Sequence, residues 1–507
     1  MASHAEMDSS GGTRAYVLSG VGIAVLALTA LGALLRFATL GQQSYWYDEA
    51  VTVSIVDGSL ADVFRGVVDT ESTPPLYYVL AWGWGQVFGT DEAQLRALSA
   101  IVGTLVIPIA FAAGRAVATA HIGLAAAALA ALSPMLVWYS QEARAYALLT
   151  LTAGASFVLY ALARAEPSAR RLAWWAVVSA LAIATHYFAG FVVLAEAALL
   201  LRRHRGSTPV RLAVAAAAGA AACMLPLAVV QAGHRRLGWV GGIELTDRIT
   251  EGIQRLVAAG QPSSWWGATG AQVTPYAWLG AVAILALAAA LLAKRASDEE
   301  RSGANLALAV VAIGIGLPVA MALVADLVSG GDGDYFLDRN VLGAWVPLAV
   351  LVGCGLAARR AGVLGAVGLA AILVWSGAVY VDIATSPELQ RDDWRAVADA
   401  LPDDDRTLVV VYPAYQSAAL VRQRPDLVEQ FAATPVDRVA LVLVGFDEAP
   451  ASFRVPDGFA RTSAKGIQHF VVLEHEREGA IETKPDDVAR GPLAESDLAV
   501  LVRPGDG

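Results

Sequence analysis

Long apolar segments recur along most of this chain, separated by short polar or charged connectors. A helix of roughly 20 apolar residues crosses the ~30 Å hydrocarbon core of a bilayer, and these segments approach that length. The pattern predicts a polytopic α-helical membrane protein with about eleven spans. Their expected positions are 16–38, 95–117, 122–139, 146–163, 171–185, 187–201, 210–231, 275–293, 304–328, 341–358 and 363–381.

Arginine and lysine cluster in connectors that fall on alternate turns between these spans, so the clusters share one side of the membrane. The positive-inside rule makes that side the cytoplasm. The expected topology has a disordered cytoplasmic N-terminus (1–15) and a membrane domain over 16–381. Its first outer loop covers 41–94, and within it the apolar run 74–89 is too short to span, which predicts an interfacial or re-entrant helix.

The tail, residues 382–507, differs in kind from the rest of the chain. Short β-branched runs such as "TLVVVY", "DRVALVLVGF" and "IQHFVVLEH" alternate with helical segments. Runs of this length and composition are typical of buried strands. They predict a small C-terminal α/β extracytoplasmic domain.

Composition agrees with a membrane protein, because 56% of the residues are hydrophobic and only 16% are charged. The net charge of -10 argues against a nucleic-acid partner. Both cysteines, Cys223 and Cys354, fall inside expected spans, where they are interpreted as small apolar residues rather than a disulfide or metal pair.

The first outer loop is too long for a simple connector. Its stretches "DEAVTVSIVDG" and "SLADVFRGVVD" carry apolar residues at helical spacing, which predicts two short amphipathic helices on the membrane surface. Asp48 stands at the start of the first of these helices. It would act either as an N-cap, satisfying free backbone donors, or as a chemical group.

Three further outer loops contain polar and ionisable side chains. Such residues are costly at membrane depth and are usually held there for use, although each alone could be a snorkelling residue or a helix-end partner. Together they suit a substrate with a lipid tail and a phosphate, since the planar guanidinium donates two parallel hydrogen bonds to a phosphate. The loops are "YSQEARAY" with Gln141, Glu142 and Arg144, "THYFAG" with His186 and Tyr187, and "DYFLDRN" with Asp338 and Arg339.

The ordered set of "YWYDEA", "TPPLYY", "FGTDEAQLRALSA", "SPMLVWYSQEARAYAL", "THYFA", a late arginine and "DDWRAVADAL" resembles the GT-C glycosyltransferases. More narrowly, it resembles family 39 and the RgtA/B/C/D-like group of bacterial enzymes. The resemblance covers residues 16–200 well and the rest loosely. It implies transfer of a sugar from a polyprenyl-phosphate carrier to an acceptor on the outer face of the membrane.

The family pattern also assigns roles to residues of this chain. Its acidic pair matches the expected catalytic residues Asp48 and Glu49, with Asp48 as the catalytic base. Thr73 stands where relatives often have Lys or His, and Asn340 where they often have Tyr, so Arg144 competes with Arg339 for the carrier phosphate. The expected substrate-binding residues are Tyr45, Trp46, Pro74, Pro75, Tyr77, Gln141, Glu142, Arg144, Tyr146, His186, Tyr187 and Arg339.

A lipid phosphate is already a good leaving group, so the reaction mainly lacks a nucleophile. One carboxylate that takes the acceptor's proton supplies general-base catalysis, and a single displacement inverts the anomeric carbon. Tyr45, Trp46 and Tyr47 would anchor the loop at the interface. No cofactor or metal is predicted; a divalent cation is left open, with Glu49 as one conceivable ligand.

The expected partners are a polyprenyl-phosphate sugar, membrane lipid and a cell-envelope acceptor, which is a glycan, a glycolipid or a protein. The expected location is the plasma membrane, multi-pass, with the active site and the tail domain extracytoplasmic. A transporter or lipid flippase is the alternative, although the spans carry almost no charge and no two halves match. A third reading is a non-catalytic scaffold that binds cell-wall polymer.

Overall fold

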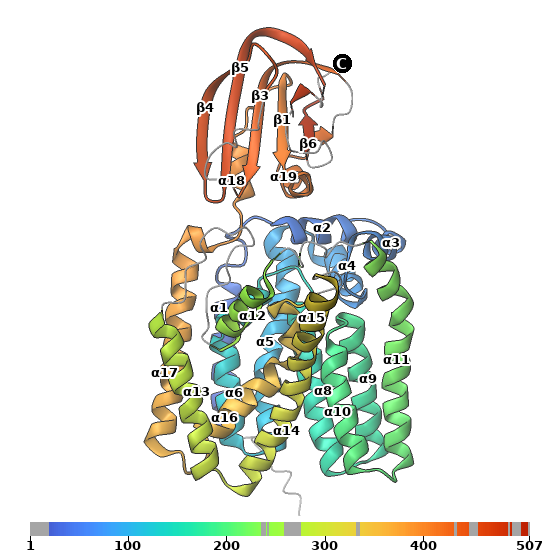
Figure 1. Ribbon diagram of the computed structural model, residues 1–507, viewed down its shortest axis with the longest axis vertical. Helices are drawn as coiled ribbons and strands as arrows, with labels where there is room; N and C mark the ends of the chain where they lie inside the picture. Colours follow the sequence, from blue (N-terminus) through green and yellow to red (C-terminus); the bar gives the residue numbers. More distant parts are fainter. Residues whose placement is uncertain are drawn as a thin grey trace, which may run out of the picture.

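A computed structural model describes residues 20–234, 240, 243–257, 275–330, 335–429, 433–445, 455–484, 487–488 and 498–504. A bundle of long helices forms the larger part, and a β-sheet stands beyond one end of it (Figure 1). The expected disordered stretch 1–15 lies outside the described residues.

The described part of the bundle runs from α1 to α17, with η2 as a 3-10 helix before α16. The bounds are α1 Gly20–Phe37, α2 Tyr47–Val56, α3 Leu60–Thr70, α4 Leu76–Phe88, α5 Glu92–Val117, α6 Ala120–Leu132, α7 Pro134–Ser140, α8 Tyr146–Ala165, α9 Ala169–Thr185, α10 Ala189–Arg203, α11 Thr208–Gly233, α12 Leu245–Val257, α13 Pro275–Arg295, α14 Asp298–Gly314, α15 Gly316–Ser329, η2 Asp338–Ala344, α16 Trp345–Leu356 and α17 Gly362–Thr385.

Within the described ranges, eight helical segments are long and apolar enough to cross a membrane, or nine if a bent pair counts as one span. This bears out the helical multi-span class. The count of about eleven is not confirmed, because α9 has 17 residues and α10 has 15, below a full crossing. The bent pair is α6 and α7, which meet at 57°.

The bend between α6 and α7 has a local cause. Ser133 caps α7 through the backbone N–H of Leu136, and Pro134 begins the new helix. The buried guanidinium of Arg36 then donates to the carbonyl oxygens of Ala130 at 3.0 Å and Ala131 at 3.3 Å. Those carbonyls at the end of α6 have lost their helical partners, so an arginine from α1 satisfies them.

Close backbone contact joins α5 to α6 near their connection. A Cβ added to Gly114 would lie 2.7 Å from the Cα of Gly123, and no real side chain fits at that distance. Glycine at both positions therefore lets the two helices pack backbone to backbone.

The short helices α2, α3 and α4 lie at the end of the bundle that faces the sheet (Figure 1). Ser59 and Asp62 form a reciprocal capping box at the start of α3. Gly89, with φ of +90°, ends α4. Buried Tyr45 and Val53 pack with α3, α4 and the start of α5, so this whole segment is a folded layer rather than a loose loop.

The C-terminal part is a six-stranded mixed sheet in the order β2-β6-β1-β3-β5-β4, with β1 and β3 parallel. Helices α18 and α19 lie at the end of the sheet nearest the bundle (Figure 1), and α19 contacts α2. The bounds are η3 Pro387–Leu389, α18 Trp394–Ala400, β1 Thr407–Tyr412, η4 Ala414–Gln416, α19 Ser417–Gln423, β2 Val428–Glu429, β3 Thr434–Val444, β4 Ala460–Ile467, β5 Phe470–Thr483 and β6 Ala499–Val502.

Candidate active site

Asp48 lies in the first turn of α2, but it does not cap the helix. The N-cap is Trp46, without a side-chain cap hydrogen bond. The Asp48 carboxylate instead faces two arginines: its Oδ2 is 3.7 Å from Nη1 of Arg339 and 4.0 Å from Nη2 of Arg144. Its side chain is 18% exposed, so the carboxylate keeps an open side toward solvent or a ligand.

Arg144 belongs to the turn between α7 and α8. The carboxylate of Glu71, at the end of α3, binds it with two parallel contacts of 2.5 and 3.0 Å. Its guanidinium also lies 5.9 Å from the ring centre of Tyr78. The Arg144 guanidinium is therefore fixed in orientation, because the carboxylate balances its charge and binds it in its plane.

Arg339 lies in η2 and is buried, with its guanidinium 5.5 Å from the ring centre of Tyr146. The ring of His186 lies 6.1 Å from the same tyrosine. Burial, together with the charges of Arg339 and Arg144, lowers the pKa of His186 to about 3. The imidazole is therefore neutral near pH 7, and the positive charge here belongs to the arginines.

Next to Arg339, Asp338 holds Arg255 of α12 at 3.0 Å. Two arginines thus lie near one partly exposed carboxylate, Arg144 from the turn before α8 and Arg339 from η2, and Arg255 of α12 is joined to the residue next to Arg339. Guanidinium groups of this kind bind phosphate oxygens, and a carboxylate beside them can accept a proton. The arrangement has the chemistry for displacement at a phosphate-linked carbon.

Glu49 differs from its neighbour Asp48, because adjacent helical residues point about 100° apart. Its buried carboxylate accepts from Arg96 Nε at 2.7 Å and from the backbone N–H of Ala143 at 2.8 Å, and a second contact joins it to Arg96 Nη2. These bonds join α2 to α5 and to the turn that carries Arg144. In this structure Glu49 anchors the site, and its catalytic role stays a prediction.

Several predicted substrate-binding residues surround the centre and hold its parts together. The hydroxyl of Tyr45 donates to Thr90 O at 2.9 Å, that of Tyr77 meets Ser99 Oγ at 3.1 Å, and that of Tyr187 donates to Gln231 Oε1 at 2.7 Å. Gln231 in turn donates to the carbonyls of Val67 and Thr73. Pro74 and Pro75 lead into α4, with Pro75 as its N-cap residue.

Glu142 and Gln141 also have structural partners. Glu142 Oε1 lies 3.2 Å from Arg391 Nη2, and both side chains are buried. The Arg391 guanidinium stacks on Trp138 at 4.0 Å. Gln141 donates to the carbonyl of Arg36 at 3.1 Å and so ties the turn to the end of α1.

The segment that leads into α18, together with the first residues of α18, is hydrogen-bonded to the first loop. Ser44 Oγ donates to Asp392 O and accepts from Trp394 N, both at 2.9 Å. Arg395 reaches the carbonyls of residues 41–43. Further along, Arg422 pairs with Asp57 at 3.2 Å. The sheet domain is therefore bonded directly to the layer that carries Asp48.

Three important partners were not predicted from the sequence: Glu71, Arg96 and Arg255. Arg96 could have been noticed in the sequence, because it interrupts the start of an apolar span, where a charged side chain is costly. Glu71 and Arg255 left none, because their partners are 73 and 83 residues away in the chain.

In the described parts of the chain, no three His, Cys, Asp or Glu side chains gather so as to hold a metal ion. That observation leaves the expectation of a metal-free, cofactor-free site as a prediction.

Residues 72–230 match the model of the family described as dolichyl-phosphate-mannose-protein mannosyltransferase. A sequence search of curated proteins finds no match to this chain.

Among solved structures, ArnT from Cupriavidus metallidurans in the apo state aligns over 90% of this chain and 98% of its own, with 12% identity and a TM-score of 0.50. The same protein bound to undecaprenyl phosphate aligns over the same shares, with 13% identity and a TM-score of 0.49. The Pmt1-Pmt2 complex of S. cerevisiae bound to its sugar donor aligns over 43% of this chain and 34% of that one, with 16% identity and a TM-score of 0.33.

At such identities a structural likeness speaks for the fold. The family match covers residues 72–230, about a third of the chain, and it agrees with the resemblance to membrane glycosyltransferases drawn from the motifs.

Proposed function

We propose that this protein transfers a sugar from a polyprenyl-phosphate donor to a hydroxyl group of a cell-envelope acceptor, with Asp48 as the general base. The observation that carries the proposal is the placement of one partly exposed carboxylate within 4.0 Å of two buried guanidinium groups, those of Arg144 and Arg339.

An apolar pocket supports a lipid-linked donor. It lies between α6, α7, α12, α13, α16 and α17 and encloses about 700 Å³ of empty space, including space open to its surroundings. Its walls include Leu256, Ile284 and Trp345, and Arg255 lies at its edge. Because Arg255 pairs with Asp338, the residue before Arg339, a lipid tail in this pocket would bring its phosphate to the arginines. The description of the matching family also names a dolichyl-phosphate sugar.

The proposed reaction is a single displacement. The acceptor oxygen attacks the anomeric carbon and gives its proton to Asp48, while the bond from that carbon to the carrier phosphate breaks. Arg339 and Arg144 stabilise the charge that develops on the leaving phosphate, and the product is inverted. A positioned base of this kind contributes about 10²–10⁴-fold to the rate.

The proposed location is the plasma membrane, with the Asp48 layer and the sheet domain on the extracytoplasmic side. The support is the placement of the arginine-rich connectors. Arg164, Arg170 and Arg171 lie by the α8–α9 connection and Arg202 and Arg203 at the end of α10, and the Asp48 layer is at the opposite end of the bundle (Figure 1).

The test is transfer by the purified protein in nanodiscs, using a panel of polyprenyl-phosphate hexoses and pentoses. Asp48→Asn should lower kcat by about 10²-fold or more, the range for loss of a general base, while donor binding persists. Arg339→Ala should weaken donor binding. Asp69→Asn is a matched control, because Asp69 is an exposed aspartate of the same layer. Full turnover by Asp48→Asn would remove Asp48 from the base role.

A further inference from the structure

Asp392, in the chain between η3 and α18, has an acidic side chain that the proposed reaction does not use. The residue is only 5% exposed, and its two carboxylate oxygens have no hydrogen-bond partner within the described residues. Neither of these oxygens is sealed from solvent. A buried carboxylate without a counter-charge or a hydrogen bond is costly, so its presence here points to a ligand from outside the chain.

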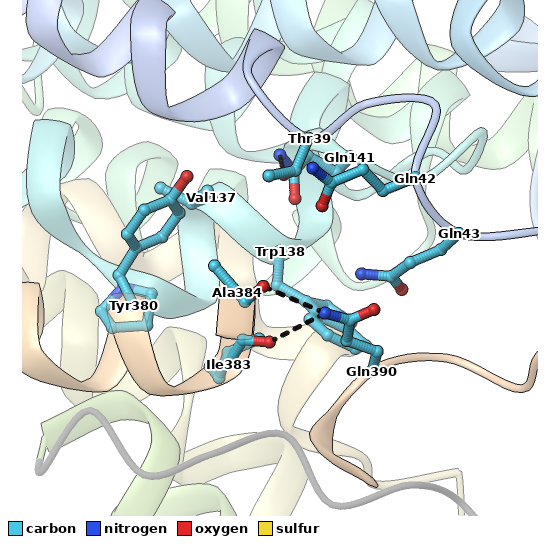
Figure 2. Close-up of a pocket in the computed structure, with 11 residues that line it drawn as sticks. Thr39, Gln42, Gln43, Val137, Trp138, Gln141, Tyr380, Ile383, Ala384 and Gln390 are labelled. Atoms are coloured by element: carbon cyan, nitrogen blue, oxygen red, sulfur yellow. Dashed lines mark hydrogen bonds between the residues drawn. The ribbon is translucent and has the colours of Figure 1, made fainter. Parts of the chain in front are cut away.

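The backbone on both sides of Asp392 is held in place by other groups. Gln390 Nε2 donates to a carbonyl in the last turn of α17 at 3.1 Å, and Gln43 Oε1 accepts from the backbone N–H of Arg391 at 3.0 Å. Figure 2 shows these two glutamines near one another. Ser44 Oγ donates to the Asp392 carbonyl oxygen at 2.9 Å. The Asp392 carboxylate is therefore not needed to fix this segment.

The basic side chains next to Asp392 in the chain are directed to other acids. Arg391 is paired with Glu142 at 3.2 Å, and Arg395 lies 3.4 Å from Glu92. In the described part of the chain, no basic group lies within ion-pair distance of the Asp392 carboxylate. Burial raises the pKa of this carboxyl to about 7, and no neighbouring cation opposes that shift.

Two tyrosines connect Asp392 to the Asp48 centre. Tyr415 lies in η4, just after the carboxyl end of β1, and its ring meets that of Tyr47 of α2 edge to face, with centroids 4.9 Å apart. Burial raises the pKa of the Tyr415 hydroxyl, and the negative charges of Asp392 and Asp48 raise it further. Both carboxylates therefore lie within electrostatic range of one hydroxyl, on a residue that is 42% exposed.

Tyr415 approaches Asp48 from the sheet domain, whereas the arginines approach it from the bundle. Arg144 and Arg339 are the proposed clamp for the departing phosphate. In a single displacement, the nucleophile approaches from the side opposite the leaving group. Because α2 lies between the bundle and the sheet domain (Figure 1), an acceptor that comes from the sheet side meets Tyr415 and Asp392 as it reaches Asp48.

Aromatic rings beside an unpaired carboxylate are the elements of a site for an organic cation. An ammonium group would supply the missing counter-charge, whereas a neutral hydroxyl would leave the negative charge uncompensated. We infer that Asp392 and the two tyrosines bind a primary ammonium group of the acceptor, beside the hydroxyl that Asp48 deprotonates. Resting on the proposed function, the inference names the acceptor class: an amine-bearing sugar unit of a soluble glycan or of a glycolipid.

The test is binding to the full-length protein in nanodiscs without donor, measured by saturation-transfer difference NMR. The probe is 2-aminoethyl α-mannoside, and 2-hydroxyethyl α-mannoside is its uncharged counterpart. Asp392→Asn removes the charge at constant shape, Tyr415→Ala removes the ring, and Tyr415→Phe keeps the ring without its hydroxyl. Asp399→Asn is the matched control, because Asp399 is an exposed aspartate of α18.

We expect the amine to bind wild type and the Asp399→Asn control equally, and at least tenfold more tightly than its uncharged counterpart does. Asp392→Asn should weaken binding of the amine about 10–100-fold, the range for one lost hydrogen bond to a charged group. Tyr415→Ala should weaken it about threefold or more, as for a lost ring contact, and Tyr415→Phe should weaken it less.

The pH dependence separates a charge effect from lost packing. The Asp392 carboxyl, with its pKa of about 7, is mostly neutral at pH 6 and mostly ionised at pH 8, while the primary amine stays protonated. Affinity for the amine should therefore rise about tenfold from pH 6 to pH 8 in wild type and stay constant in Asp392→Asn. Equal binding of the two mannosides, undiminished binding in Asp392→Asn, a flat pH profile in wild type, or no binding of the amine at all would overturn the inference.

Transfer assays identify the source of the amine and keep the two proposals apart. If the amine belongs to a soluble glycan, Asp392→Asn raises KM for a soluble amino-sugar acceptor; if it belongs to a glycolipid, KM rises for an amino-sugar glycolipid embedded in the nanodisc. An unchanged KM for both would refute the acceptor assignment. Because amine binding is measured without donor and should persist in Asp48→Asn, failure of amine binding leaves the transferase proposal standing, and failure of transfer leaves the binding result standing.

Discussion

Glu49→Gln should damage stability more than it damages the chemistry, although Glu49 stands beside the proposed base. Arg96 is fully buried and makes bonds to the carbonyls of Gln43 at 2.7 Å and Ser44 at 2.9 Å, but its only described counter-charge within ion-pair distance is Glu49. Removing the negative charge leaves a buried guanidinium without a counter-ion.

Breaking a buried ion pair from one side costs about 3–5 kcal/mol. The amide oxygen of glutamine still accepts one hydrogen bond, which puts Glu49→Gln near 3 and Glu49→Ala near 5 kcal/mol on the same scale. A loss of that size is a large part of the ~5–15 kcal/mol that holds a typical protein folded. Asp48→Asn should cost much less, because the Asp48 contacts of 3.7 and 4.0 Å exceed hydrogen-bond length.

The assay is thermal unfolding of each purified variant in one detergent at pH 7, with transfer measured on the fraction that remains folded. Replacing both partners, as in Glu49→Leu with Arg96→Met, should recover only the part of the loss that comes from the lone charge, because the carbonyls of Gln43 and Ser44 and the N–H of Ala143 then lose their partners. Glu92→Gln is the control: its ion pair with Arg395 at 3.4 Å is partly exposed and contributes at most about 1 kcal/mol. If Glu49→Gln unfolds like wild type but fails in transfer as Asp48→Asn does, Glu49 takes part in the reaction and the anchor interpretation is wrong.

Three other changes test the surroundings of the site. Arg391→Gln leaves Glu142 buried without its ion pair and should lower kcat by displacing the turn that carries Arg144. The double variant Arg391→Gln with Glu142→Gln should restore part of the rate, and no restoration would argue against this positioning role. Burial raises the pKa of Asp392 from 3.8 to about 7, so its stabilising contribution is complete below pH 4 and is lost as the pH rises through 7. Asp392→Asn should therefore unfold at a higher temperature than wild type at pH 8 and at the same temperature near pH 4. A constant difference in unfolding temperature across that range would contradict the reasoning. Gly114→Leu should prevent α5 and α6 from meeting and reduce the yield of folded protein, whereas a normal yield would mean that the close backbone contact is dispensable.

Local pattern was enough to predict the helical class and three of the strands. The apolar runs gave most of the long helices, and the β-branched runs correspond to β1, β3 and β5. The short or exposed strands β2 and β4 carry no such pattern, since Val428 and most of β4 lack a buried side to mark them. The division of α6 from α7 is marked locally by Ser133 and Pro134, whereas the arginine of α1 that satisfies the end of α6 leaves no trace in local periodicity.

The candidate site was predictable only in part, for the same reason. Asp48, Arg144 and Arg339 were found because charged groups at the end of a span are conspicuous. Which of two adjacent carboxylates faces the arginines depends on the rotation of α2, and that rotation is fixed by Arg96, 47 positions further along. Distant partners therefore decide the roles of neighbouring residues.

The bonds between the sheet domain and the first loop also bear on how this protein is made. Ribosomes release the Asp48 layer early, because it lies within the first hundred residues. The groups that fasten it, from Asp392 to Arg422, arrive only after the last long helix. A chain cut short after α17 would therefore keep Asp48 but lack the contacts that secure its layer.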